Sequence, residues 1–240
     1  MDTVEELKEI VAQVKGFLAA NMDEGFDPPE ISQPVLEYLE KGLDTGMPDS
    51  RTLEDLEQAV QNCSRCRLAK FRKKAVLGEG SPNSRLVFIG ACPGENEERE
   101  ERPFAGPSGE LLTKIIEKGM GLKRPDVYIC NIIKCRPPGD RDCRRSEVEA
   151  CMVHLNKQLD LIKPEVICTL GGTAAKELLG KEFKVLEERG TWHSFRGIYV
   201  MPTLHPAYIL RYPSRERQLK GLVWEDIQKI MVRLGLKKGE

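Results

Sequence analysis

The stretch Leu86-Val87-Phe88-Ile89-Gly90 decides the fold of this 240-residue chain. A short, wholly apolar run that ends in glycine is typical of a strand that is buried on both faces. Similar runs recur at residues 127–131, 166–170 and 198–202, and segments with helical periodicity lie between them. This alternation predicts an α/β domain of the doubly wound type, with a mostly parallel four-stranded central sheet flanked by helices.

The predicted strand ends carry the residues that are suited to chemistry. In sheets of this type the ligand crevice lies beyond the carboxyl ends of the strands. The loop after the first strand, residues 90–98, contains glycine and proline, and its backbone N–H groups can bind an anion. The end of the second strand carries Asn131, whose amide both donates and accepts hydrogen bonds, and the loop after the last strand carries His205. We therefore expect one ligand site where these strand ends meet.

Four of the eight cysteines have the spacing of a metal site. Cys63 and Cys66 form a tight pair, and Cys135 and Cys151 follow far downstream. Cys135 lies only four positions after Asn131, so a metal ligand would anchor the end of the strand that carries this amide. The spacing alone is compatible with a structural zinc site or with an iron–sulfur cluster.

Charge divides the chain into two parts. Residues 1–60 hold 15 Asp and Glu against 4 Lys and Arg, whereas residues 61–240 hold 33 Lys and Arg against 23 Asp and Glu. We expect residues 1–50 to form an acidic helical extension through which a protein partner binds, and residues 51–240 to form the α/β domain. The excess of Lys and Arg in residues 61–240 is typical of proteins that bind nucleic acid.

The sequence also indicates where in the cell the protein is expected. It contains no apolar run of about eighteen residues that could span a membrane, and its acidic first residues lack the pattern of a secretory signal. We therefore expect a cytoplasmic monomer that does not associate with membranes. In that reducing compartment the cysteines should be thiols and metal ligands, without structural disulfides.

From residue 63 to residue 234 the chain resembles the family 4 uracil-DNA glycosylases, which carry an iron–sulfur cluster and excise uracil from DNA. The resemblance includes the cysteine pair and four further motifs: Val76-Leu77-Gly78-Glu79-Gly80, Pro93-Gly94 with Arg102-Pro103-Phe104-Ala105-Gly106, Asn131 with Lys134-Cys135-Arg136-Pro137-Pro138, and His205-Pro206-Ala207-Tyr208-Ile209-Leu210-Arg211. It implies a [4Fe-4S] cluster whose ligands are Cys63, Cys66, Cys135 and Cys151. It also implies that uracil-containing DNA is the substrate.

The resemblance implies a role for each residue of the site. A base within a duplex must be flipped out, stacked and read at its Watson–Crick edge. Phe104 is expected to stack on uracil, Asn131 to donate to O4 and accept from N3–H, and His205 to donate to O2, where negative charge develops. The other residues expected around the base are Ala91, Cys92, Gly94 and Glu97, the last of which would crowd out a thymine methyl group. Those expected to contact DNA are Ser108, Arg136, Tyr208 and Arg211.

Two positions depart from the family pattern. The family usually has Gly-Glu-Ala-Pro-Gly where this chain has Gly90-Ala91-Cys92-Pro93-Gly94, so the motif carboxylate is missing. A general base contributes about 10²–10⁴-fold, so its loss predicts a slow enzyme rather than none. Glu101 stands where the family often has Gly, and this is expected to reshape the loop before Phe104.

The resulting hypothesis is a monofunctional uracil-DNA glycosylase that uses water as the nucleophile and leaves an abasic site, with deaminated bases other than uracil as further candidate substrates. Asn131 and His205 would be its catalytic residues. The alternative is a catalytically weak or inactive DNA-binding relative that recognises flipped or damaged bases.

Overall fold

The structure is a computed structural model, and it describes residues 50–180 and 182–236. The helices predicted within residues 1–49 lie outside the described residues. The strands are β1 (Glu79–Gly80), β2 (Leu86–Gly90), β3 (Tyr128–Asn131), β4 (Val166–Leu170), β5 (His193–Phe195) and β6 (Ile198–Thr203). The α-helices are α3 (Leu53–Gln61), α4 (Glu95–Glu100), α5 (Pro107–Lys114), α6 (Arg145–Ile162), α7 (Gly172–Leu179), α8 (Val185–Glu188), α9 (Pro206–Arg211) and α10 (Glu216–Leu234).

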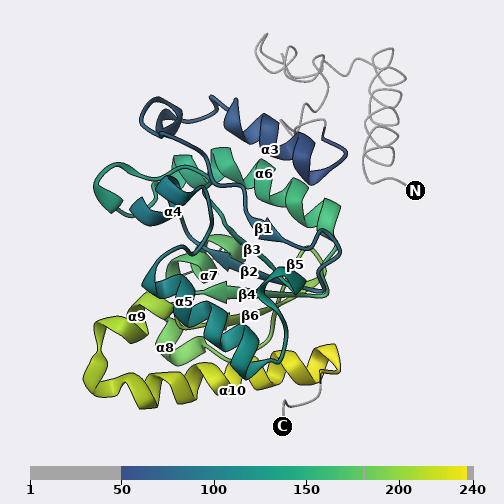
Figure 1. Cartoon of the computed structure of the whole chain (residues 1–240), viewed down its shortest axis with the longest axis vertical. Coiled ribbons are helices and arrows are strands. Elements are labelled where there is room, and N and C mark those ends of the chain that lie inside the picture. Colours follow the sequence, from purple (N-terminus) through teal and green to yellow (C-terminus); the bar gives the residue numbers. More distant parts are fainter. Residues whose placement is uncertain (1–49, 181, 237–240) are drawn as a thin grey trace, which may run out of the picture. The chain divides into compact units, whose positions relative to one another are not determined.

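The strands form one sheet in the order β1-β3-β2-β4-β6-β5 (Figure 1). The four central strands β3, β2, β4 and β6 pair in parallel, so the predicted parallel core is confirmed. The sheet also has two edge strands that the sequence did not indicate, because β1 and β5 add antiparallel pairs there. These two strands have only 2 and 3 residues, which is too short for an alternating pattern to show in the sequence.

Successive residues of the central strands contribute to two separate cores. Val87 and Ile89 face a cluster formed with α3, α6 and α7, whereas Leu86 and Phe88 face a cluster formed with α5, α9 and α10. Figure 1 shows α3 and α6 on one side of the sheet and α5 and α10 on the other. Burial on both faces explains why these strands are apolar without alternation. In the described part of the chain, no helix has the length and apolar character needed to cross a membrane.

Helix α4 ends in a turn that normally favours glycine. Its C-cap residue, Glu101, has φ 55° and ψ 27°, the left-handed conformation that is common at helix C-termini. The chain makes this turn with a glutamate, whose carboxylate lies 3.4 Å from Lys74 Nζ at the surface. Three residues later Phe104 also has a positive φ, 51°.

A buried polar network joins β3 to α6. Lys134 is fully buried, and its Nζ donates to the backbone oxygen of Asn131 at 2.5 Å and to Gln158 Oε1 on α6. Gln158 Nε2 donates in turn to the Tyr128 hydroxyl at 2.9 Å and to the backbone oxygen of Leu77 at 3.0 Å. Because all of these groups are buried, each depends on the others for its hydrogen bonds.

We predict that Lys134→Met destabilises the domain by roughly 2–4 kcal/mol, since it leaves two buried acceptors without a donor. Equilibrium denaturation in urea measures this. Lys118→Met is the matched control, because Lys118 is exposed and its replacement should change the stability by less than about 0.5 kcal/mol. Equal stabilities for the two variants would contradict the importance of the network.

Candidate active site

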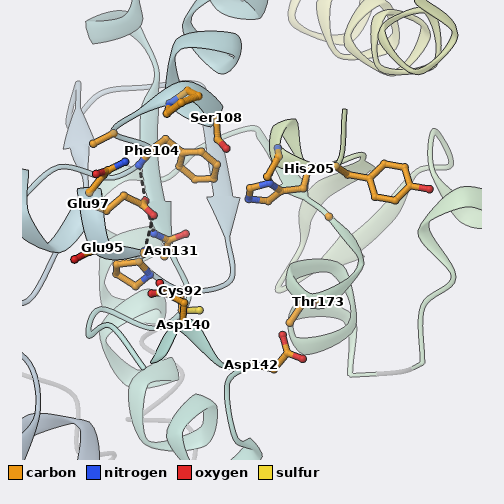
Figure 2. A pocket seen from close by; sticks show the side chains of 18 of the residues that line it. Cys92, Glu95, Glu97, Phe104, Ser108, Asn131, Asp140, Asp142, Thr173 and His205 are labelled. Atoms are coloured by element: carbon orange, nitrogen blue, oxygen red, sulfur yellow. Dashed lines mark hydrogen bonds between the residues drawn. The ribbon is translucent and has the colours of Figure 1, made fainter. Parts of the chain in front are cut away.

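One cavity of about 690 Å³ lies at the carboxyl ends of the parallel strands, where the sequence predicts a ligand site. Its walls come from the loops that follow β2, β3, β4 and β6 and from the first turns of α5 and α9. The predicted site residues that line it are Cys92, Gly94, Glu97, Phe104, Ser108, Asn131, His205, Tyr208 and Arg211. Figure 2 shows Asn131 and Glu97 on one side of this pocket, with His205 opposite them.

Gly90 allows the pocket to form at the end of β2. A Cβ atom at this position would lie 2.3 Å from Asn131 Oδ1 and 2.8 Å from the Phe104 ring. Gly90 pairs with Asn131 in the register of β2 and β3. The Asn131 amide and the Phe104 ring therefore pack directly on the backbone of Gly90, in space that a side chain would fill. Glycine is the residue that permits such close approach.

Glu97 connects three segments of the pocket. Its carboxylate accepts hydrogen bonds from the backbone N–H of Gly94 at 2.8 Å, from the N–H of Phe104 at 2.5 Å and from Asn131 Nδ2 at 3.2 Å (Figure 2). Burial raises the pKa of Glu97, and these three hydrogen bonds oppose the rise. The sequence does not indicate this bridging role, because Glu97 lies in an acidic run that resembles a solvated helix face.

Hydrogen bonding fixes the orientation of the Asn131 amide. Asn131 is 2% exposed, and its Nδ2 donates to Glu97, which can only accept when it is ionised. The amide oxygen Oδ1 therefore remains available on the pocket side. Asn131 thus presents an acceptor and one further N–H to any ligand that enters.

His205 is held in one tautomer. Its Nδ1 accepts a hydrogen bond from the backbone N–H of Ala207 at 3.0 Å, so a neutral ring carries its proton on Nε2. Burial lowers the pKa of His205 to about 4, and the charge of Arg211 contributes to the shift. The ring stacks on Phe104 with 5.5 Å between centroids and 28° between planes. Nε2–H is therefore a neutral donor at physiological pH.

Two predicted site residues do not line the cavity in this structure. Ala91 is only partly exposed and is absent from the pocket wall. Arg136 pairs with the carboxylate of Asp140 at 2.7 Å, and it lies 3.7 Å from that of Glu98 and 3.9 Å from that of Glu95. The Arg136 guanidinium, which was expected to contact DNA, is therefore paired with acidic side chains of the protein.

The pocket wall contains carboxylates that the sequence analysis did not single out. Besides Glu97, the acidic residues that line it are Glu95, Asp140 and Asp142. Asp140 is bound to Arg136, which keeps the pKa of Asp140 below its usual range. The side chain of Asp142 has no hydrogen bond or ion pair with any described residue, and Figure 2 places it near Thr173. The position of this loop directly after β3 could have suggested these residues.

The four cysteines predicted to bind metal come together away from the pocket. Cys63, Cys66, Cys135 and Cys151 line one small hollow between the segment after α3, the exit of β3 and α6. Nitrogen atoms lie close to two of the sulfur atoms. Arg72 donates to Cys135 Sγ at 3.2 Å, and His154 Nε2 lies 3.2 Å from Cys63 Sγ.

The donor set suits thiolate ligands, because donors to sulfur stabilise its negative charge and tune a bound metal. All eight cysteines are free thiols. Within residues 50–180 and 182–236, no three His, Cys, Asp or Glu side chains are placed to hold a single metal ion. The four cysteines nevertheless line one hollow, and four cysteine thiolates are the ligand set of a cluster of several irons.

The family model of the uracil DNA glycosylase superfamily matches residues 77–228, which include every residue that lines the pocket. A type-4 uracil-DNA glycosylase of Sulfurisphaera tokodaii is 41% identical over 187 residues, which cover 75% of this chain and 83% of the relative. The chain belongs to the type-4 uracil-DNA glycosylases.

Two other relatives agree with this assignment. The type-4 uracil-DNA glycosylase of Thermotoga maritima is 41% identical over 181 residues, 74% of this chain and 92% of the relative. That of Saccharolobus solfataricus is 40% identical over 193 residues, 77% of this chain and 88% of the relative. The matched part of this chain therefore covers most of the length of these relatives.

The lowered pKa of His205 predicts a pH dependence of stability. In the unfolded chain the ring binds a proton below about pH 6.5, whereas in the folded protein it does so only below about pH 4. The folded state is therefore favoured above pH 6.5 and loses this advantage as the pH falls toward 4. Between pH 7 and about pH 4.5 the wild type should lose about 2 kcal/mol more stability than His205→Gln. Urea denaturation at both pH values measures this, and equal losses would contradict it.

Proposed function

We propose that this chain hydrolyses the N-glycosidic bond of uracil in DNA, acts as a monofunctional glycosylase and leaves an abasic site. The observation that carries the proposal is the pocket in which Asn131 and His205 face each other beside the ring of Phe104. Membership of the type-4 family supports it. Other deaminated bases are candidates for the same pocket.

Base recognition would follow from the fixed amide of Asn131. Its Oδ1 would accept from uracil N3–H, and the Nδ2 hydrogen that does not bind Glu97 would donate to O4. Cytosine presents an amino group and a bare ring nitrogen at these positions, so both contacts would be mismatched. Each buried unpaired group costs about 1–3 kcal/mol, which supports discrimination against cytosine. Phe104 would stack on the base, and Glu97 would crowd out the thymine methyl group.

Bond cleavage would depend on His205. Breaking the bond leaves negative charge on the departing base, and a preorganised donor at O2 stabilises charge that develops in the transition state. The Nε2–H of the neutral ring is such a donor, because the Ala207 N–H already occupies Nδ1. A neutral donor keeps its proton as the charge forms.

Water would be the nucleophile at the sugar, and a carboxylate in the pocket would orient it. Neither Ala91 nor Cys92 supplies one. Glu97 is engaged with three donors, and Asp140 is bound to Arg136. Asp142 is the carboxylate of the pocket wall that remains without a partner among the described residues, and we assign the orienting role to it.

The proposal includes a [4Fe-4S] cluster with Cys63, Cys66, Cys135 and Cys151 as ligands. Its support is the single hollow that these residues line and the nitrogen atoms that lie close to two of their sulfur atoms. The cluster would be structural, since hydrolysis of a glycosidic bond requires no redox step. It would hold the loop between Cys135 and Cys151, which carries Asp140 and Asp142, beside the pocket.

Contacts to DNA would come from the rim of the pocket. Arg211 is exposed on α9, and Tyr208 on the same helix packs against Tyr212 with 4.9 Å between ring centroids. Ser108 lies in the first turn of α5. We propose that Arg211, Ser108 and Arg136 contact phosphates and that Tyr208 enters the stack. For Arg136 this would require partial release from Asp140.

The division into residues 1–50 and residues 51–240 is also part of the proposal. The acidic extension would bind a protein partner, and the chain would act as a monomer. The charge difference between the two parts supports a separate role for the extension.

His205→Ala should lower the single-turnover rate of uracil excision by about 10²–10³-fold, because it removes a donor that acts in the transition state. The measurement uses end-labelled oligonucleotides with one uracil, followed by alkaline cleavage of abasic sites. His193→Ala is the control, since His193 lies on the edge strand β5 and does not line the pocket. It should retain the wild-type rate.

The same assay tests the alternative function. If the wild type binds uracil-containing DNA but produces no abasic sites, the chain is a DNA-binding relative without turnover. Excision by His205→Ala at the wild-type rate would instead contradict the role of the imidazole.

Asp142→Asn should slow excision by at least about tenfold without weakening DNA binding, since the loss of a water-orienting group affects the reaction step. Glu95→Gln is the matched control, because the Glu95 side chain is 71% exposed on the same wall. Adding Ala91→Glu to Asp142→Asn should restore part of the rate. If Asp142→Asn and Glu95→Gln excise equally fast, Asp142 does not orient the water.

A further inference from the structure

The loop that carries Phe104 has a costly backbone conformation. Between α4 and α5 three residues have a positive φ, namely Glu101 at 55°, Phe104 at 51° and Gly106 at 84°. Glycine adopts this conformation freely, whereas a residue with a large side chain does so at a cost in free energy. Phe104 is nevertheless 5% exposed, and its ring stacks on that of His205 (Figure 2). Contacts from outside the loop must therefore stabilise this backbone.

Two charged side chains hold Phe104 by its backbone. The carboxylate of Glu97 accepts from its N–H at 2.5 Å. On the carbonyl side lies Arg124, the first residue of a short 3-10 helix that precedes β3. Its Nη2 donates to the backbone oxygen of Pro103 at 2.8 Å and, at 3.5 Å, to that of Phe104. Phe104 thus lies between a carboxylate that binds its N–H and a guanidinium that binds its carbonyl side.

The same guanidinium also reaches α5 and β1. Arg124 Nη1 donates to the backbone oxygen of Gly109 at 3.3 Å and to Thr113 Oγ1 at 2.8 Å, both on α5. Its Nε donates to Glu79 Oε1 on β1 at 2.6 Å. The side chain is 12% exposed, and all three of its nitrogen atoms have acceptors. The planar guanidinium presents its donors in fixed directions, so this one side chain joins the loop, α5 and β1.

Close packing on two sides limits where the Phe104 ring can lie. A Cβ atom at Gly109 would lie 1.4 Å from the Phe104 carbonyl oxygen, so the loop backbone packs directly on α5. A Cβ atom at Gly90 would lie 2.8 Å from the ring. The ring therefore depends on a backbone position that the hydrogen bonds of Arg124 maintain.

We propose that Arg124 is a positioning residue for uracil excision, because it holds the Phe104 backbone so that the ring is in place to stack on the extruded base. This rests on the proposed function, in which Phe104 stacks on uracil. Arg124 does not line the pocket, so it acts through Phe104. A ring that is already in place loses little freedom when the base enters, so the loss of Arg124 should weaken capture of the base.

The first measurement requires no excision. The whole protein has three histidines, and the ring-proton NMR resonances of His205 report on the stacked ring of Phe104. In Arg124→Gln these resonances should shift, whereas those of His193 on β5 should not and so report that the domain is folded. Unshifted His205 resonances in a folded Arg124→Gln would overturn the proposal.

Arg102→Gln is the matched control. Arg102 Nε donates to the same carboxylate, Glu79, at 2.8 Å, but its side chain is 57% exposed and has no other hydrogen-bond partner among the described residues. This variant should leave the His205 resonances unchanged. Arg124→Lys keeps the charge but not the planar set of donors, so it should give a smaller shift than Arg124→Gln. It replaces Arg124→Gln in both measurements if that variant does not fold.

The second measurement separates positioning from a general loss of stability. Single-turnover excision of uracil at subsaturating enzyme is compared for Arg124→Gln, Phe104→Ala and the double variant. Each single change should slow excision at least about fivefold, because stacking on an aromatic ring stabilises the bound base. In the Phe104→Ala background, Arg124→Gln should cost less than about twofold, because the ring that it positions is already absent.

Equal losses in the two backgrounds would overturn the proposal, since they would show that Arg124 acts independently of Phe104. If the wild type produces no abasic sites, the proposed function fails. The histidine resonances then still decide whether Arg124 holds the Phe104 ring, so the two failures can be told apart.

Discussion

Lys134 is the point at which the pocket strand, helix α6 and the cysteine hollow meet. Its side chain binds the backbone oxygen of Asn131 and Gln158 on α6, and the residue lines the same hollow as Cys151. The next residue is Cys135. A buried lysine of this kind is tolerated only where its donors are satisfied, so its partners cannot move independently. The end of the strand that carries Asn131 and the helix that carries Cys151 are therefore joined by one side chain.

Glu97 has a similar organising role within the pocket. Its carboxylate accepts hydrogen bonds from the backbone N–H of Gly94, from the strained backbone of Phe104 and from the Asn131 amide. A large residue with positive φ costs free energy, and its hydrogen bond to an ionised acceptor offsets part of that cost. The same carboxylate fixes the orientation of the Asn131 amide in the pocket. The orientation of the amide and the geometry of the loop thus depend on one carboxyl group.

The sequence predicted the parallel core and nine of the residues that line the pocket, because buried strands and the loops that follow them leave local patterns. Asn131 and His205 follow apolar runs directly, which made them visible. The edge strands β1 and β5 were missed because they are too short for a pattern. The bridging role of Glu97, and Asp142 altogether, were missed for a different reason. Their importance comes from partners, or from the absence of partners, that only the tertiary structure reveals, and in the sequence both look like ordinary surface acids.

The missing carboxylate of the first motif has a structural counterpart. An active site needs its charge at a place in space, and several loops reach that place at the carboxyl ends of a parallel sheet. Here the loop between Cys135 and Cys151 supplies Asp140 and Asp142 to the wall that contains Cys92. With the proposed cluster bound, the cysteines that flank this loop would anchor it at both ends, so its acidic residues would be positioned by the fold rather than by their own short segment. Under the proposed function, a carboxylate that is absent from one loop would thereby be replaced from another, and the pocket would keep a group that orients water.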